Sequence, residues 1–152
     1  MRAVLQRVTQ ARVVVAGETV GEIGRGWLVL LGVGHGDSVV TAVALADKAA
    51  GLRSFEDSQG KTNLAAADVG AQWLVVSQFT LLADVTRGRR PGFSNAAPPA
   101  LAEALVASFG ARLRELGFEV ATGRFGAHMQ VSLTNDGPFT LWLDSDQVLR
   151  PS

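Results

Sequence analysis

The sequence predicts a single α/β domain in which two main helices pack on mixed β-sheets. Three observations support this prediction. Apolar residues come in short runs broken by 17 glycines, strand-like and helix-like segments follow the order ββββ-α-β-α-βββ, and the 152 residues are about the size of one domain. Hydrophobic residues make up 47% of the chain and charged residues 18%, which excludes a disordered or coiled-coil protein.

Strands are expected through the first third of the chain. Each is marked by apolar-polar alternation or by an apolar run bounded by glycines, and together they span residues 2–8, 12–15, 19–23 and 27–33. The connection between the second and third strands contains Gly17 and predicts a hairpin. Asp37 or Ser38 can then cap a helix that extends to about Ser54.

The second half begins with another strongly apolar strand, followed by an irregular stretch with many arginines and prolines. Pro98 and Pro99 favour a helix start, and Gly117 is placed to end that helix. The expected elements are a strand at 73–79, an irregular segment at 84–99, a helix at 100–116, and strands at 118–121, 129–135 and 139–144. The tail, residues 145–152, is expected to lie outside the core.

Charge and composition exclude several classes of function. Fourteen basic and fourteen acidic residues give zero net charge, which argues against a general nucleic-acid binder and against DNA as a partner. No apolar run approaches a membrane span and no signal peptide is evident, so a cytoplasmic protein without a membrane partner is expected. The chain has no cysteine, and His35 and His128 are far apart, so neither a metal site nor a cofactor is expected.

Two segments keep alternative interpretations open. Arg87, Arg89 and Arg90 form either a solvated loop or a phosphate contact, because arginine forks match phosphate oxygens. Residues 32–37, which follow a strand and precede a helix, form either a capping turn or a dinucleotide site. Asp37 stands where the third glycine of a dinucleotide fingerprint belongs, which favours the turn.

Polar residues stand at two strand ends. Ser77, Gln78 and Thr80 arrive at the end of an apolar strand, where backbone N–H groups can be left free to bind an anionic oxygen. Gly137 and Pro138 divide two strands, and a Gly–Pro bond can be cis. Ordinary turns would also explain both segments.

Together these segments resemble the D-aminoacyl-tRNA deacylase family of chiral proofreading enzymes. SQFT at 77–80 and NDGPFT at 135–140 resemble the two signature motifs of that family. The resemblance runs in order through nearly the whole chain, in residues 6–8, 21–24, 28–33, 75–81, 90–94, 122–125 and 129–140. One departure is Phe139, where a smaller β-branched residue is common.

The resemblance implies a three-layer α/β/β fold and a homodimer whose active site lies at the subunit interface. It implies hydrolysis of the ester that joins a D-amino acid to the terminal adenosine of tRNA, releasing the D-amino acid and reusable tRNA. Glycyl-tRNA is expected to be accepted as well, because glycine has no side chain for a stereochemical filter to reject. A catalytically silent module that binds the tRNA end is the alternative.

The resemblance also assigns site residues. Ser77, Gln78, Phe79 and Thr80 are the expected catalytic segment, and the arginines at 87, 89 and 90 are expected tRNA contacts. Substrate binding and chiral selection are expected of Arg7, Phe125, Met129, Asn135, Gly137 and Pro138. Arg7 is expected to brace the Gly137–Pro138 loop, whose peptide bond is expected to be cis.

A reaction without a basic side chain fits this assignment. Thr80 is an obvious nucleophile, but a hydroxyl with no adjacent base is weak at neutral pH. The family resemblance implies that the 2′-OH of the substrate ribose activates water, while backbone N–H groups around Gln78, Phe79 and Thr80 stabilise the oxyanion.

Overall fold

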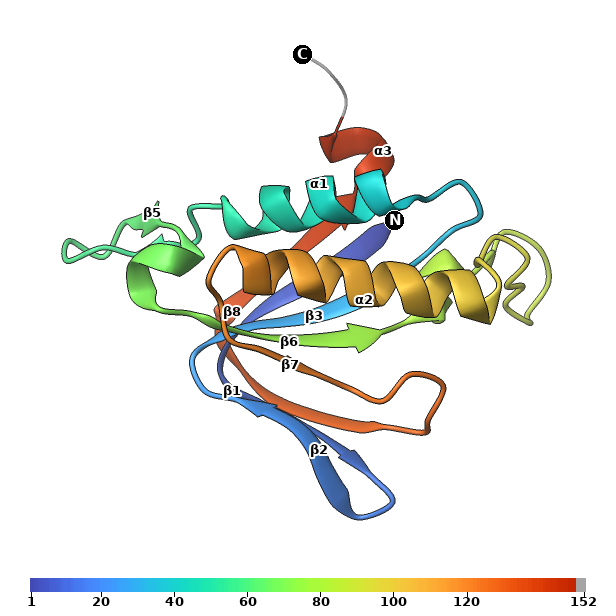
Figure 1. Cartoon of the computed structure of the whole chain (residues 1–152), viewed down its shortest axis with the longest axis horizontal. Coiled ribbons are helices and arrows are strands. Elements are labelled where there is room, and N and C mark those ends of the chain that lie inside the picture. The colour runs from blue at the N-terminus through green and yellow to red at the C-terminus, as the bar shows by residue number, and fades with distance from the viewer. Residues whose placement is uncertain (150–152) are drawn as a thin grey trace.

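The longest strand pairing organises the molecule. The computed structural model describes residues 1–149, and in it β1 (Arg2–Val15) pairs antiparallel with β8 (Gln130–Asp144) from Arg2–Asp144 to Val14–Gln130 (Figure 1). The prediction of two strands in each of these segments was therefore wrong. β8 pairs with Val8, Gln10 and Ala11 and so carries β1 through its expected break, whereas β8 resumes its pairing with β1 after residues 136–139 bulge out.

The other strands flank β1 and extend the sheet. The first half of β1 pairs with β3 (Gly26–Gly32), and its second half pairs with β2 (Glu18–Ile23), which forms the predicted hairpin. β3 runs parallel to β6 (Gln72–Ser77), which in turn runs parallel to the short β7 (Val120–Thr122). The sheet is mixed, as the sequence predicted.

Two helices, α1 (Val39–Ala50) and α2 (Pro99–Glu115), cover one face of the sheet (Figure 1). The Ser38 hydroxyl caps α1 by accepting a hydrogen bond from the Thr41 N–H at 3.3 Å. The helix ends at Ala50 rather than near residue 54. The Gly51 N–H still bonds the Asp47 carbonyl at 3.1 Å, but the Leu52 N–H bonds the Ala49 carbonyl at 3.3 Å, which breaks the α-helical pattern. No helix among the described residues is long and apolar enough to cross a membrane.

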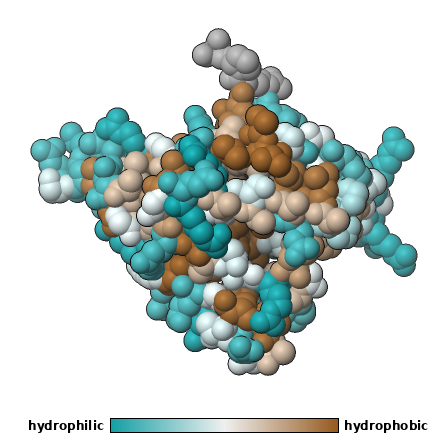
Figure 2. Space-filling model, in the orientation of Figure 1, coloured by the Kyte–Doolittle hydropathy of each residue, from teal (hydrophilic) through white to brown (hydrophobic). Residues whose placement is uncertain are grey.

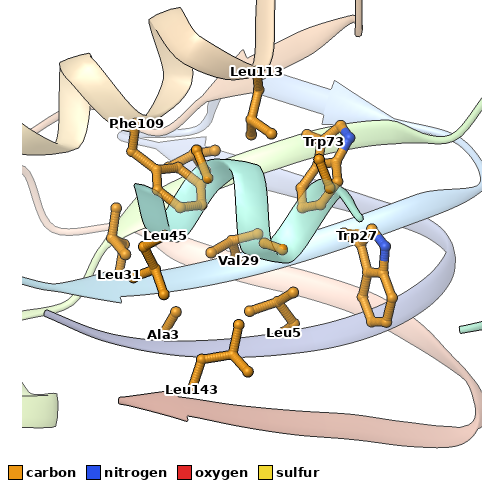
Figure 3. Close-up of a cluster of buried hydrophobic side chains, with 14 of the residues drawn as sticks. Ala3, Leu5, Trp27, Val29, Leu31, Leu45, Trp73, Phe109, Leu113 and Leu143 are labelled. Carbon is orange, nitrogen blue, oxygen red and sulfur yellow. The ribbon is translucent and has the colours of Figure 1, made fainter. Parts of the chain in front are cut away.

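Two hydrophobic cores lie on opposite faces of the central strands. The main core packs Phe109 and Leu113 of α2 over Trp27 and Trp73 of the sheet (Figure 3). The second core includes Val8, Leu28 and Leu74, together with residues of the β1–β2 hairpin that curls beneath the sheet. Helices, central strands and curled hairpin form the three α/β/β layers that the family resemblance implied.

A small hairpin projects from the helical layer where the sequence indicated only a turn. It is built from β4 (Phe55–Glu56) and β5 (Thr62–Leu64), and the 3₁₀ helix η1 (Ala66–Val69) follows it. Asp57 closes its turn by accepting hydrogen bonds from the N–H groups of Lys61 and Gln59 at 3.0 and 2.9 Å. These bonds stabilise the carboxylate and lower the pKa of Asp57.

The beginning of the tail packs on the core, which corrects the expectation that residues 145–152 lie outside it. The short helix α3 (Ser145–Val148) begins with the buried Ser145, whose hydroxyl accepts a hydrogen bond from the Met1 ammonium at 2.6 Å. Val148 and Leu149 pack against the main core because α3 turns back over β8. Residues 150–152 lie outside the described part of the chain.

The fully buried Phe109 provides a test of the main core. Phe109→Ala is expected to lower the free energy of unfolding by about 3–5 kcal/mol, because the site loses apolar contacts and gains a cavity. Val40→Ala, at a residue that is 78% exposed, is the control and should change it by less than about 0.5 kcal/mol. Chemical denaturation measures both values. Equal values for the two variants would contradict the assignment of Phe109 to the core.

Candidate functional site

A hollow lies where β6 ends. Ser77 is the last residue of β6, and η2 (Phe79–Leu82) begins two residues later. The strand predicted over 73–79 therefore stops short, because the Gln78 N–H makes the last bond of the sheet, to the Leu31 carbonyl at 2.8 Å, and the chain then coils into η2. A cavity of about 620 Å³ opens over this junction.

The opposite wall of the cavity comes from the irregular segment and the start of α2. Phe93, Ala97 and Ala102 line it, and Phe125 closes one side. Sequence reasoning did not assign Phe93 a role, although residues 90–94 belong to the family resemblance and Phe93 follows the arginine loop directly. A mainly apolar cavity with a few polar groups at one end is typical of a small-molecule or cofactor site.

Two aromatic side chains stand at the mouth of the cavity. Phe79 and Phe93 meet edge to face with ring centroids 4.9 Å apart, and they are 56% and 38% exposed. Exposed aromatic rings are costly in water and provide faces on which a nucleobase can stack. His35 lines the same cavity and is exposed, with its Nε2 2.7 Å from the Ser94 carbonyl oxygen.

Residues 77–80, the expected catalytic segment, offer backbone amides as hydrogen-bond donors. Phe79 and Thr80 begin η2, and within residues 1–149 their N–H groups have no acceptor, as is usual in the first turn of a helix. The Gln78 side-chain amide donates to the Thr80 hydroxyl, so the two side chains hold each other. Among the described residues that line the cavity, His35 alone has a titratable side chain.

No metal centre accompanies this cavity in the described part of the chain, where no group of three or more histidine, cysteine or acidic side chains could hold an ion. The arrangement can bind a polar oxygen through backbone amides and an apolar group through the cavity walls. Of the predicted catalytic residues, Ser77, Gln78 and Phe79 line the cavity, whereas Thr80 is not part of its lining, and the described lining contains no carboxylate.

The Gly137–Pro138 loop lies on β8, at a break in its pairing with β1. The register runs from Gln6–Thr140 to Val8–Asn135, so the residues between bulge away from the sheet beside Arg7. The Gly137–Pro138 peptide bond is cis, as expected, and both residues are exposed. Gly137 has φ +145°, and a Cβ there would lie 2.7 Å from the Phe139 nitrogen, so the position favours glycine.

Two side chains hold this loop from below. The Asn135 amide donates to the carbonyls of Arg7 and Phe139 at 2.9 and 3.0 Å, and its oxygen accepts the Phe139 N–H at 3.0 Å. Arg7 donates from Nε to the Asp136 carbonyl at 3.1 Å and from Nη1 to the Ser54 carbonyl at 2.7 Å. The contact with Asp136 agrees with the expectation that Arg7 braces the loop, whereas the contact with Ser54 could not be predicted from the sequence.

The loop and the cavity lie far apart in one chain. The loop sits opposite Arg7, which pairs with Trp27 and through it with Trp73, whereas the cavity begins at Ser77. Four residues along the strands correspond to about 13 Å, and the three strand spacings from β8 to β6 add about 14 Å across the sheet. The cavity lining includes Phe125 but neither Gly137 nor Pro138.

Met129 is also away from the cavity. Its side chain packs against the second core, and its sulfur lies 2.6 Å from where a Cβ on Gly123 would stand. The structure therefore places Met129 beneath the 123–125 turn, where it supports the chain that leads to Phe125. The role in substrate binding expected of Met129 stays a prediction, because its half-buried side chain packs against the second core and Met129 is not among the residues that line this cavity.

The arginine loop projects beside the mouth of the cavity. Arg87, Arg89 and Arg90 are exposed, and Figure 2 shows this loop and the β4–β5 hairpin as hydrophilic projections on opposite sides of the molecule. Asp84 and Gly92 close the loop with two backbone hydrogen bonds of 2.7 and 2.8 Å. The Thr86 hydroxyl and N–H donate to the Asp84 carboxylate and lower the pKa of Asp84.

Comparison with known proteins agrees with this geometry. A family model described as D-Tyr-tRNA(Tyr) deacylase matches residues 4–144. The chain belongs to this family. It is 59% identical over 145 residues to a D-aminoacyl-tRNA deacylase of Roseiflexus sp. (strain RS-1), which covers 95% of this chain and 94% of the relative. A D-aminoacyl-tRNA deacylase of Symbiobacterium thermophilum is 56% identical over 147 residues, 97% of each chain.

Solved structures match the deacylase fold as well. A structure titled c-Myc DNA Unwinding Element Binding Protein has a TM-score of 0.89 and 42% identity, covering 95% of this chain and 98% of that one. A probable eukaryotic D-amino acid tRNA deacylase has a TM-score of 0.80 and 18% identity, covering 93% of this chain and 97% of that one, and shows the fold alone.

Proposed function

We propose that this member of the deacylase family hydrolyses the ester bond of D-aminoacyl-tRNA and releases the D-amino acid and tRNA. In the cytoplasm, this reaction removes D-amino acids from tRNA before they can enter translation. One observation supports it above all. The Phe79 amide at the cavity lining and the adjacent Thr80 amide have no acceptor within residues 1–149, and they lie beside an apolar hollow whose described lining holds no carboxylate and no basic side chain except His35. Such a site suits an acyl group that is already activated, as an aminoacyl ester is.

The cavity accepts the terminal adenosine, and the ester lies over the start of η2. The rings of Phe79 and Phe93 offer stacking surfaces for the base, a contact that contributes about 1–3 kcal/mol per base in other proteins. The amides of Phe79 and Thr80 then donate to the carbonyl oxygen as it gains negative charge. The 2′-OH of the ribose activates the attacking water, and Ser77, Gln78 and Thr80 orient the ester.

Chirality is selected by the Gly137–Pro138 loop of a second subunit in a homodimer. One chain cannot bring its own loop to its own cavity, because roughly 13 Å along the strands and 14 Å across them separate the two. The loop is exposed and presents main-chain atoms rather than a long side chain. A wall of main-chain atoms at the α-carbon excludes any L side chain and admits D-amino acids and glycine.

The substrate tRNA extends from the cavity over the arginine loop. Arg87, Arg89 and Arg90 lie beside the mouth and present charge to phosphates at the end of the tRNA. The chain has zero net charge and one basic loop, which suits a local contact with tRNA better than nonspecific binding to DNA. A catalytically silent tRNA-end binder is the alternative, and turnover distinguishes the two.

The chemistry is tested by changing the substrate. D-tyrosyl-tRNA should be hydrolysed in the presence of a chelator and L-tyrosyl-tRNA should not, while Thr80→Ala should retain measurable turnover because Thr80 is not the nucleophile. D-tyrosyl-tRNA ending in 2′-deoxyadenosine should be inert. Release of labelled tyrosine measures each rate. Normal hydrolysis of the 2′-deoxy substrate would contradict the mechanism, and no hydrolysis of either enantiomer would favour the silent binder.

The arginine loop is tested by salt dependence. Replacing Arg87, Arg89 and Arg90 with alanine should weaken tRNA binding and flatten the plot of log K against log salt, because each lost phosphate contact removes about 0.7–0.9 from the slope. The double variant Lys48→Ala/Lys61→Ala, which also removes exposed positive charge, is the control. An unchanged slope in the triple variant would leave the loop as a solvated turn.

A further inference from the structure

Phe139 follows the Gly137–Pro138 loop and turns its side chain toward the main core. Its ring lies on the same face of β8 as Leu141 and Leu143, which pair with Leu5 and Ala3 of β1. The ring centroid of Phe139 is 6.0 Å from that of Trp27, which in turn lies 5.5 Å from Phe55. Phe139 is thus anchored in an aromatic cluster at one end of the core.

The Arg7 guanidinium lies over the face of the Phe139 ring, with its Cζ 4.6 Å from the ring centroid. Arg7 is 6% exposed, so its charge is almost entirely out of water. A buried cation is costly unless its surroundings compensate it, and a ring face attracts a desolvated guanidinium most strongly. The Phe139 ring therefore contributes to keeping the charge where it is.

The other contacts of Arg7 connect this cation to the loop. Its Nε–H donates to the Asp136 carbonyl, its Nε lies 3.5 Å from the Asp136 carboxylate, and its Nη1 donates to the Ser54 carbonyl. Asp136 immediately precedes Gly137. If the Arg7 guanidinium shifts on the Phe139 ring, its hydrogen bonds to Asp136 and Ser54 lose their alignment. The Phe139 ring and the Gly137–Pro138 loop are therefore linked through Arg7.

We propose that Phe139 is a specificity-determining positioning residue: its ring fixes Arg7, and Arg7 fixes the Gly137–Pro138 loop that rejects L-aminoacyl groups. This inference rests on the proposed function. It assigns Phe139 no contact with substrate. A loop held less firmly admits an L side chain part of the time, so the measurable consequence is a loss of discrimination between enantiomers.

The backbone around Phe139 allows the ring to be tested alone. Asn135 binds the N–H and the carbonyl of residue 139, and neither bond depends on the side chain there. Phe139→Leu keeps an apolar side chain of related size and removes the ring face, whereas Phe139→Tyr keeps the ring. Phe118→Leu is the matched control, because Phe118 packs edge to face on Trp73, 5.6 Å between centroids, and no arginine within residues 1–149 lies over its ring.

The experiment measures kcat/KM for D- and L-tyrosyl-tRNA in these variants. Phe139→Leu should lower the D-over-L ratio about tenfold, mostly by raising hydrolysis of the L substrate, as expected when a desolvated cation–π contact is lost. Phe139→Tyr should keep the wild-type D-over-L ratio. Phe118→Leu should also keep the wild-type ratio, even if this variant lowers the midpoint of unfolding. Phe139→Met repeats the test with another side chain that has no ring.

A second readout does not depend on activity. Hydrogen exchange of the Arg7 Nε–H, followed by NMR, should be faster in Phe139→Leu and slow in Phe139→Tyr. Wild-type protein that hydrolyses both enantiomers equally would overturn the proposed function. Wild-type protein that discriminates, together with a Phe139→Leu variant that discriminates equally and keeps slow exchange at Arg7, would overturn only the role of Phe139.

Discussion

The pairing of β1 with β8 is the constraint on which the rest of the structure depends. Over its length β1 belongs to both cores, with Ala3 and Leu5 in the main core and Val8 and Val13 in the second core. The pairing is interrupted opposite Arg7, where β8 contains the residues that bulge outward. A rigid two-stranded frame therefore carries an exposed loop whose base is held by buried contacts, which is how a rigid scaffold positions a functional loop.

The frame also determines where chemistry is possible. The parallel strands β3 and β6 deliver their carboxyl ends to one edge, where Leu31 receives the last sheet bond and η2 begins with unpaired amides. The Gly137–Pro138 loop lies toward the other end of the same strands. The fold therefore separates the backbone amides that can stabilise negative charge from the loop that is proposed to select the D-enantiomer. In the proposed homodimer, two copies of the chain bring both groups to one substrate, and neither function then depends on a reactive side chain.

Much of this architecture could be predicted from local sequence. Glycine-bounded apolar runs located β3 and β6, and Ser38 and Pro99 located the starts of α1 and α2, because these signals act over a few residues. The continuity of β1 and β8 could not be seen, since it arises from pairing between segments more than 100 residues apart. For the same reason, the Ser54 carbonyl contact with Arg7 and the packing of Met129 into the core required the fold.

The central claim is that one subunit's loop completes the other subunit's cavity, and a defined heterodimer tests it most directly. One chain carries Ala102→Phe, which fills the cavity, and the other carries Gly137→Ala, which places a Cβ 2.7 Å from the Phe139 nitrogen. Each homodimer should be inactive or unselective. The purified heterodimer should regain selective D-aminoacyl-tRNA hydrolysis at about half the wild-type rate, because one of its two sites combines an intact cavity with an intact loop. A heterodimer without selective activity would contradict the account, because it would mean that each loop serves the cavity of its own chain.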